Sequence, residues 1–239
     1  MLESPYVGQI SEHNQRIIEQ LTASKNWDFQ QFTRVMVALS TIDQYMPGRR
    51  APQSIHIQGF RKKLDRLYEL SDEAGLEHAQ PILTDIDTRK FVYGRITRGS
   101  KHRVRLDSKK QEGREHLQKR ILSMHIHPKG EGIGNGLGLS NADFTTLLSD
   151  SEQIGMMMRV IDTIFLVLKT NVTPNNLNKS AVERMIQQAN KDYLVDSKKV
   201  DILRLVDFNR AVCMESGMVL FMATKQSRDL MERVKVAVE

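Results

Sequence analysis

The sequence contains a single cysteine, Cys213, among its 239 residues. One cysteine cannot form an internal disulfide, so the fold has to be held by a packed core, and we expect a reducing compartment. No nucleophile motif surrounds Cys213. We therefore interpret it as a small, buried hydrophobic residue.

Long hydrophobic runs are also missing. No apolar stretch approaches eighteen residues, so the sequence predicts no membrane span and no membrane partner. The first five residues, MLESP, lack the basic and then apolar pattern of a secretory signal. The expected location is cytoplasmic.

The overall composition is that of an ordinary globular protein. Hydrophobic residues make up 40% of the chain and charged residues 27%. A chain of 239 residues can bury a substantial core, either as one large domain or as one domain with an extension.

Helical spacing of apolar residues dominates the first fifty positions, until Met46, Pro47, Gly48 and Pro52 interrupt it. A second helix is predicted from Phe60 to Ala74, with Gly75 as its end. We therefore predict an N-terminal helical extension over residues 1–55 and a main domain over residues 56–239.

From Phe91 onward, predicted strands and helices alternate. Alternation of this kind favours an α/β fold with a mixed sheet flanked by helices. Strands are expected at 91–97, 102–106, 120–127, 161–168 and 218–223, and helices at 108–119, 143–148 and 200–214. Another helix should open at a capping box formed by Ser180 and Glu183.

Two histidines end the apolar run that begins near Ile121. His125 and His127 are separated by one residue, so on a strand both rings point to the same face, about 7 Å apart at their bases. Two imidazoles in this arrangement can converge on one metal ion. Pro128 and the glycines beyond it then end the strand.

A carboxylate that follows these histidines can complete a metal site. Asp143 lies at the expected start of a helix, and a catalytic zinc site needs three protein ligands and one open position. Ser140 and Asp143 can equally be a helix N-cap and a first-turn acid. The two interpretations are compatible, because a capped helix start can also face a site.

At these residues the chain resembles the JAB/MPN (JAMM) metalloprotease family, whose motif is His-x-His-x7-Ser-x2-Asp with a Glu well upstream. His125, His127, Ser140 and Asp143 match this motif in type and order. Twelve residues separate His127 from Ser140 instead of seven. An insertion of five residues within the Gly-rich stretch 129–138 accounts for the difference, and loop closure tolerates such added length.

The resemblance covers mainly residues 90–170 and implies a JAB/MPN-like (cytidine-deaminase-like) mixed sheet. It also implies Zn²⁺ held by His125, His127 and Asp143, with Ser140 helping to stabilise the tetrahedral intermediate. The implied activity is hydrolysis of peptide or isopeptide bonds, including those of ubiquitin-like conjugates.

The general base of the family has no clear counterpart. The family's Glu opens a strand read as Glu-x-x-Gly, and the corresponding stretch here begins with Phe91, which cannot accept a proton. Asp87 is our choice for this role, because it lies just before that strand. The other nearby carboxylates are Glu77, Asp85, Glu112 and Glu115.

Positive charge is concentrated in one region. Residues 89–120 hold twelve Lys or Arg and three Asp or Glu, a local charge of +9 against +6 for the whole chain. Such a region can meet nucleic acid phosphates or an acidic protein, or it can be a solvated sheet face. The alternative function is therefore a catalytically inactive JAB/MPN-like module that binds protein or nucleic acid through this region.

Overall fold

The computed structural model describes residues 12–234 apart from 102, 108, 111, 128–138, 161, 175–176 and 194–201. Its centre is a ten-stranded mixed sheet with the order β1-β2-β10-β9-β8-β7-β6-β3-β4, and β5 pairs with β3 as well. The strands are β1 (Asn26–Trp27), β2 (Ser54–His56), β3 (His78–Asp85), β4 (Lys90–Tyr93), β5 (Thr97–Arg98), β6 (Gln118–Ile126), β7 (Gly155–Val160), β8 (Thr163–Leu168), β9 (Val219–Ala223) and β10 (Leu230–Arg233). A mixed α/β architecture flanked by helices is therefore confirmed.

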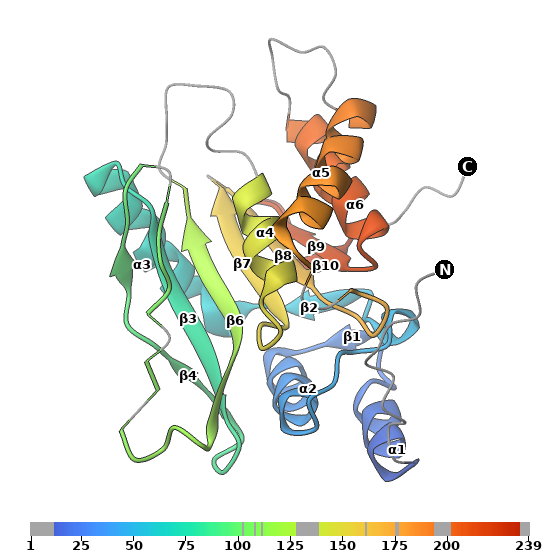
Figure 1. Ribbon diagram of the computed structural model, residues 1–239. Coiled ribbons are helices and arrows are strands. Elements are labelled where there is room, and N and C mark those ends of the chain that lie inside the picture. The colour runs from blue at the N-terminus through green and yellow to red at the C-terminus, as the bar shows by residue number, and fades with distance from the viewer. Residues whose placement is uncertain are drawn as a thin grey trace.

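Helices cover both faces of this sheet (Figure 1). They are α1 (Glu12–Leu21), α2 (Phe29–Thr41), α3 (Gln58–Ala74), α4 (Asn141–Ser149), α5 (Lys179–Tyr193) and α6 (Ile202–Glu215), with a short 3-10 turn at Gly48–Arg50. Among the described helices, none is long and apolar enough to cross a lipid bilayer.

Two hydrophobic clusters fill the two sides. One joins side chains of α1, α2 and α3 to the sheet, and the other joins α4, α5 and α6 to the opposite face. Strand β7 shows the alternation directly, because Met157 belongs to the first cluster while Met156 and Met158 belong to the second. Almost every position of the inner strands is buried, as a sheet covered on both faces requires.

Strand β6 and the parallel strand β7 are connected through α4. The pairing Met124 to Met157 and His125 to Met158 runs in parallel register, so the chain crosses over after the carboxyl end of β6. Helix α4 therefore begins near that strand end, where ligands commonly bind in sheets with such crossovers.

Strand β3 pairs antiparallel with β6 along one edge and contains Pro81, which has no backbone N–H to donate. Along its opposite edge β3 pairs with β4 and β5, and this pairing is interrupted at Pro81, because β4 ends opposite Ile82 and β5 begins opposite Ala79. Gly94 lies in the gap and its N–H donates to the Pro81 carbonyl at 2.9 Å. A Cβ at Gly94 would come within 2.6 Å of Pro81 Cγ, so a larger residue would not fit.

Several predicted elements are confirmed. Helix α3 ends at Gly75 in the left-handed conformation, as expected from the sequence. The strands at the histidines, near residue 164 and near residue 220, and the helices after 141 and 202, also lie where the pattern placed them.

The helix predicted over residues 108–119 is wrong. The described residues between 109 and 117 contain turns and no helix, and Gln118 already belongs to β6. Leu117 is the sole aliphatic residue of this stretch, so a helix there would have no apolar face to bury. Gly113, with φ of +77°, turns the chain instead. The predicted strand over 102–106 is likewise absent from its described residues, 103–106.

The region predicted as an N-terminal extension contains β1 in addition to two helices. Helix α2 places Phe32, Val35 and Met36 in the same cluster as the sheet. Farther along, α5 is capped by Asn178, whose Oδ1 accepts from the Ala181 N–H at 2.9 Å. The capping box expected at Ser180 is therefore replaced by a cap two residues earlier. The predicted insertion in residues 129–138 lies outside the described residues.

Candidate metal centre

The two histidines of β6 share one face of the sheet. Leu122, Met124 and Ile126 point into the cluster beneath α3, so Ser123, His125 and His127 face the side covered by α4 and α5. The ring centroids of His125 and His127 are 5.1 Å apart. The sequence therefore places both imidazoles correctly.

Asp143 reaches the same point from the first turn of α4. Ser140 caps this helix: its Oγ accepts from the Asp143 N–H at 3.3 Å, and the Ser140 N–H donates to Asp143 Oδ2 at 2.7 Å. The predicted cap and the predicted ligand are thus the same structure. Asp143 Oδ1 lies 3.1 Å from His125 Nε2, and Oδ2 lies 3.5 Å from His127 Nε2.

The donor atoms of these three residues fit a metal ion. One ligand atom from each of His125, His127 and Asp143 lies within 4.8 Å of the other two. His125 Nε2 is buried and has no hydrogen bond of acceptable geometry among the described residues, although Asp143 is near. A buried nitrogen whose contact with a carboxylate is not a well-directed hydrogen bond is costly, and coordination of a cation would satisfy it.

The charges of the cluster follow from burial and from mutual attraction. Burial and the neighbouring His125 lower the pKa of His127 to about 4. Burial opposes the charged form of His125, but the Asp143 carboxylate outweighs it and holds the pKa of His125 above its ordinary value. Burial also opposes ionisation of Asp143. His125 and then His127 nevertheless keep its pKa well below the usual range. Asp143 is therefore an anion here.

A fourth residue, Glu77, joins the cluster from the position immediately before β3. His78 is paired with Ile126, so the antiparallel register sets Glu77 opposite His127, and the Glu77 Oε1 to His127 Nε2 distance is 3.9 Å. The Glu77 backbone is fixed on its other side, where its N–H donates to Ser100 O at 2.9 Å and its carbonyl accepts from Gly99 N at 2.8 Å.

Glu77 has the proton affinity of a general base or acid. Burial raises its pKa, the charge of His125 lowers it in part, and Asp143 raises it further, to about 7. A group with a pKa near neutrality can both accept and release a proton at working pH. Glu77 was one of several carboxylates considered from the sequence, and the geometry sets it apart from the others.

Asp87 lies at the other end of β3. Residues 77 and 85 are eight steps apart along the strand, about 26 Å at roughly 3.3 Å per residue, and Asp87 lies beyond them. Its side chain is 64% exposed and pairs with Arg114 at 3.2 Å. The structure does not bring Asp87 to the histidines, and the geometry does not support its predicted role as the base.

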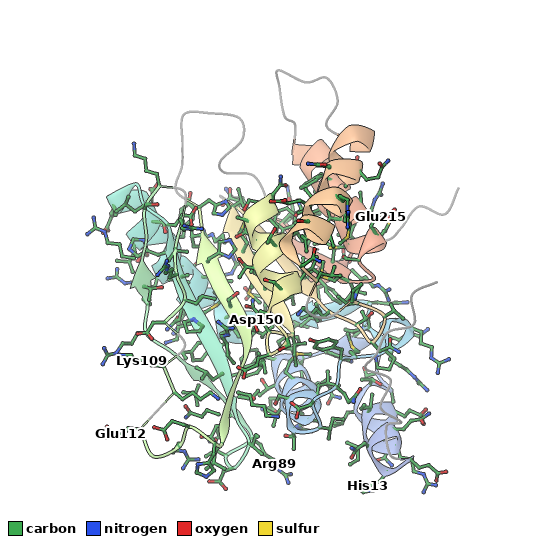
Figure 2. The ribbon with its side chains drawn as sticks, viewed as in Figure 1. His13, Arg89, Lys109, Glu112, Asp150 and Glu215 are labelled. Carbon is green, nitrogen blue, oxygen red and sulfur yellow. The ribbon has the colours of Figure 1, made fainter. Side chains whose placement is uncertain are left out.

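The remaining candidate carboxylates are also distant from the cluster. Asp85 accepts two hydrogen bonds from Arg114, at 2.9 and 3.0 Å. Glu112 and Glu115 are exposed, and Figure 2 shows Glu112 at the outer margin of the molecule.

A cavity of about 630 Å³ opens over the cluster. Its walls come from three parts of the chain: the strand ends with Glu77 and the histidines, the start of α4, and one face of α5. A further wall is formed by Arg103, Val104 and Leu106. The cavity is large enough to hold several side chains of a substrate next to the histidines.

Comparison with known proteins gives no family model that matches the chain, no curated protein with significant similarity and no similar solved structure. The resemblance to JAB/MPN metalloproteases therefore stays a prediction based on four residues. The structure itself defines a mixed α/β protein whose His125, His127 and Asp143 could hold a metal ion.

Proposed function

We propose that the protein is a zinc-dependent hydrolase of peptide or isopeptide bonds, of the JAB/MPN type. The proposal includes ubiquitin-like conjugates among the candidate substrates. One observation carries it: Glu77, with a pKa raised to about 7, lies beside a His-His-Asp group whose donor atoms already converge. This combination supplies three ligands and a separate proton carrier, which a zinc hydrolase requires.

Each residue has a distinct task in this proposal. His125, His127 and Asp143 would hold the ion, which when bound lowers the pKa of a water ligand from about 15.7 to about 7 and polarises a carbonyl. Glu77 takes a proton from the attacking water and returns it to the leaving amine. Ser140 fixes the Asp143 carboxylate through its backbone N–H at 2.7 Å, and its hydroxyl lines the same cavity.

Zinc also suits the donor set. Two imidazoles and one carboxylate with an open position are typical of catalytic zinc, whereas magnesium and calcium prefer oxygen ligands. The alternative function, an inactive module that binds through residues 89–120, remains a separate proposal. The position of Glu77 favours the hydrolase, since an inactive module has no need of a proton carrier beside the ligands.

The test compares Glu77→Gln with Asp87→Asn in protein purified without chelator. We expect about one zinc per chain in both variants, because neither residue is one of the three ligands. Cleavage of a peptide and isopeptide panel should fall by at least about 100-fold in Glu77→Gln and stay near the wild-type rate in Asp87→Asn. His125→Ala should lose the zinc.

Two results would argue against the hydrolase. If wild-type protein carries no zinc after supplementation, the three residues do not form a zinc site. If Glu77→Gln is as active as wild type, Glu77 is not the proton carrier. Loss of activity in Asp87→Asn alone would instead restore the sequence-based choice.

A further inference from the structure

Arg103 is one of the residues that line the metal-site cavity. It follows β5 in the chain and lines the same cavity as Glu77, His125 and Asp143. Of the described residues that line this cavity, Arg103 is the only lysine or arginine.

The backbone at Arg103 is held close to Glu77 by a tight loop. The Ser100 N–H donates to Arg103 O at 2.7 Å, and residues 99 and 100 bond in turn to the backbone of Glu77. A Cβ at Gly99 would lie 2.1 Å from Arg103 O, so this close approach requires glycine. The loop therefore ties the position of Arg103 to that of the candidate base.

The charge of Arg103 is not neutralised by the described part of the chain. Its guanidinium makes no ion pair with any described residue, and the residue is exposed. By contrast, Arg114, Arg120 and Arg159 each pair with an aspartate. Arg98 and Arg105 line an adjacent depression together with Arg103, and Asp107 is the one acidic residue among its described lining residues.

The other described lining residues include three carboxylates, Glu77, Asp143 and Glu183, beside polar and aliphatic side chains. Val104, Leu106 and Ile186 provide apolar surface. No phenylalanine, tyrosine or tryptophan is among the described lining residues. Single-stranded nucleic acids usually bind on aromatic side chains that stack with bases, so this cavity favours a peptide over a nucleic acid.

This inference rests on the proposed hydrolase function. We propose that the substrate is a peptide segment with Asp or Glu close to the bond that is cut, and that Arg103 selects it by binding that carboxylate. A guanidinium offers two parallel N–H donors that match a carboxylate. Arg103 is a specificity residue in this scheme, distinct from the ligands and from Glu77.

Arg105 provides a matched control. It is two residues from Arg103 and carries the same charge, but it lines the adjacent depression and not the metal-site cavity. Arg103→Glu and Arg105→Glu change the net charge of the chain equally. A difference in peptide binding between the two variants shows that the position of Arg103 in the cavity matters. Equal effects show that only the overall positive charge of residues 89–120 matters.

Binding is measured first, in the Glu77→Gln background loaded with zinc, so that peptides are not consumed. The probes are fluorescent decapeptide pools with Glu, Gln or Lys fixed at one position and the other positions randomised. Fluorescence polarisation should show Glu pools binding about tenfold more tightly than Gln pools, the difference in affinity that we expect from one charge-assisted hydrogen bond. Arg103→Glu should abolish this preference, and Arg105→Glu should keep it within about twofold.

Cleavage gives the second measurement. Wild-type protein is incubated with a peptide pool prepared from a cell proteome, and the new termini are identified by mass spectrometry. We expect Asp and Glu to be enriched near the cut in wild type and in Arg105→Glu, and the enrichment to disappear in Arg103→Glu. Zinc content and the thermal midpoint confirm that the variants are folded.

The possible failures are distinguishable. If wild type cuts nothing but binds Glu pools through Arg103, the hydrolase is wrong, and only the part of the inference that concerns binding of acidic peptides by Arg103 holds. If cleavage occurs without acidic preference, or both arginine variants lose it equally, the Arg103 inference is overturned and the hydrolase stands. Tighter binding of random single-stranded DNA than of Glu pools would make this surface a nucleic acid site and would also overturn it.

Discussion

At the scale of single residues, burial and neighbouring charge give the two histidines different protonation states. His127 is neutral at physiological pH, since its pKa is lowered to about 4 by burial and by His125. Burial also opposes protonation of His125, yet the contact with Asp143 at 3.1 Å raises its pKa above the ordinary value. The pair therefore presents one ligand that is ready for a metal and one that has to lose a proton first.

A proton count on zinc binding tests this assignment. In the Glu77→Gln variant at pH 6, we expect zinc to displace about one proton per chain, that of His125, because metal ligands must be deprotonated. Affinity should then fall about tenfold for each unit of pH decrease near pH 6. Isothermal titration calorimetry in two buffers of different ionisation enthalpy gives the count. Release of two protons would show that His127 is charged before zinc binds.

Single residues also explain why the base was difficult to choose from sequence. Glu77, Asp87 and Glu112 are all carboxylates, and the sequence alone does not distinguish their roles. Asp87 was preferred because it lies just before Phe91, which occupies the position of the family's Glu. Proximity to His127 depends on the register of β3 against β6, which a list of carboxylates does not contain.

At the scale of elements, β3 is one of the strands that sequence patterns did not reveal, as are β1, β2, β7 and β10. Pro81 lies in the middle of β3, and proline is normally confined to sheet edges and bulges. The strand is possible because β4 and β5 leave a gap opposite Pro81, which Gly94 fills. A proline is tolerated at this point of β3 because β4 and β5 do not require an N–H from it, and these two strands lie farther along the chain.

Gly94→Ala tests the packing in this gap. The added methyl group would meet Pro81 Cγ at 2.6 Å, so we expect a loss of about 1–3 kcal/mol in the free energy of unfolding. Gly48→Ala is the control, because its nearest neighbour would lie at 3.6 Å, an ordinary contact. Urea unfolding followed by circular dichroism measures both variants. Equal stability of the two would contradict the tight contact at Pro81.

At the scale of the whole molecule, the fold encloses a lysine side chain away from the metal centre. Lys169 is fully buried after β8, and its Nζ donates to the Asp150 carbonyl. The Asp150 carboxylate pairs with Arg120, and Figure 2 shows Asp150 near the middle of the molecule. Burial, and then the charge of Arg120, lowers the pKa of Lys169 to about 7.

The stability of the protein should therefore rise with pH above neutrality. The unfolded chain keeps the Lys169 proton up to its ordinary pKa of 10.5, whereas the folded chain releases it near 7. Between these values the unfolded state binds more protons, so a rise in pH favours folding. From pH 7 to 8.5, with chelator present, we expect wild type to gain about 1–2 kcal/mol relative to Lys169→Met. If the free energies of unfolding of the two proteins, measured in urea, change equally with pH over this range, Lys169 is not neutral in the folded protein.

The sequence by itself determined the features that depend on neighbours along the chain. The alternation of His125 and His127 on one strand, the cap that joins Ser140 to Asp143, and the end of α3 at Gly75 all follow from local geometry. Each involves residues a few positions apart, so backbone periodicity and hydrogen bonding within one turn fix them.

Only the tertiary structure decided which distant residues meet. Glu77 lies beside His127 because β3 and β6 pair in one antiparallel register, and Arg103 enters the same cavity because the loop at Gly99 folds back on Glu77. Contacts of this kind depend on which strands become neighbours and in what register. That choice is made by the packing of two cores on a ten-stranded sheet, and no local pattern in the chain records it.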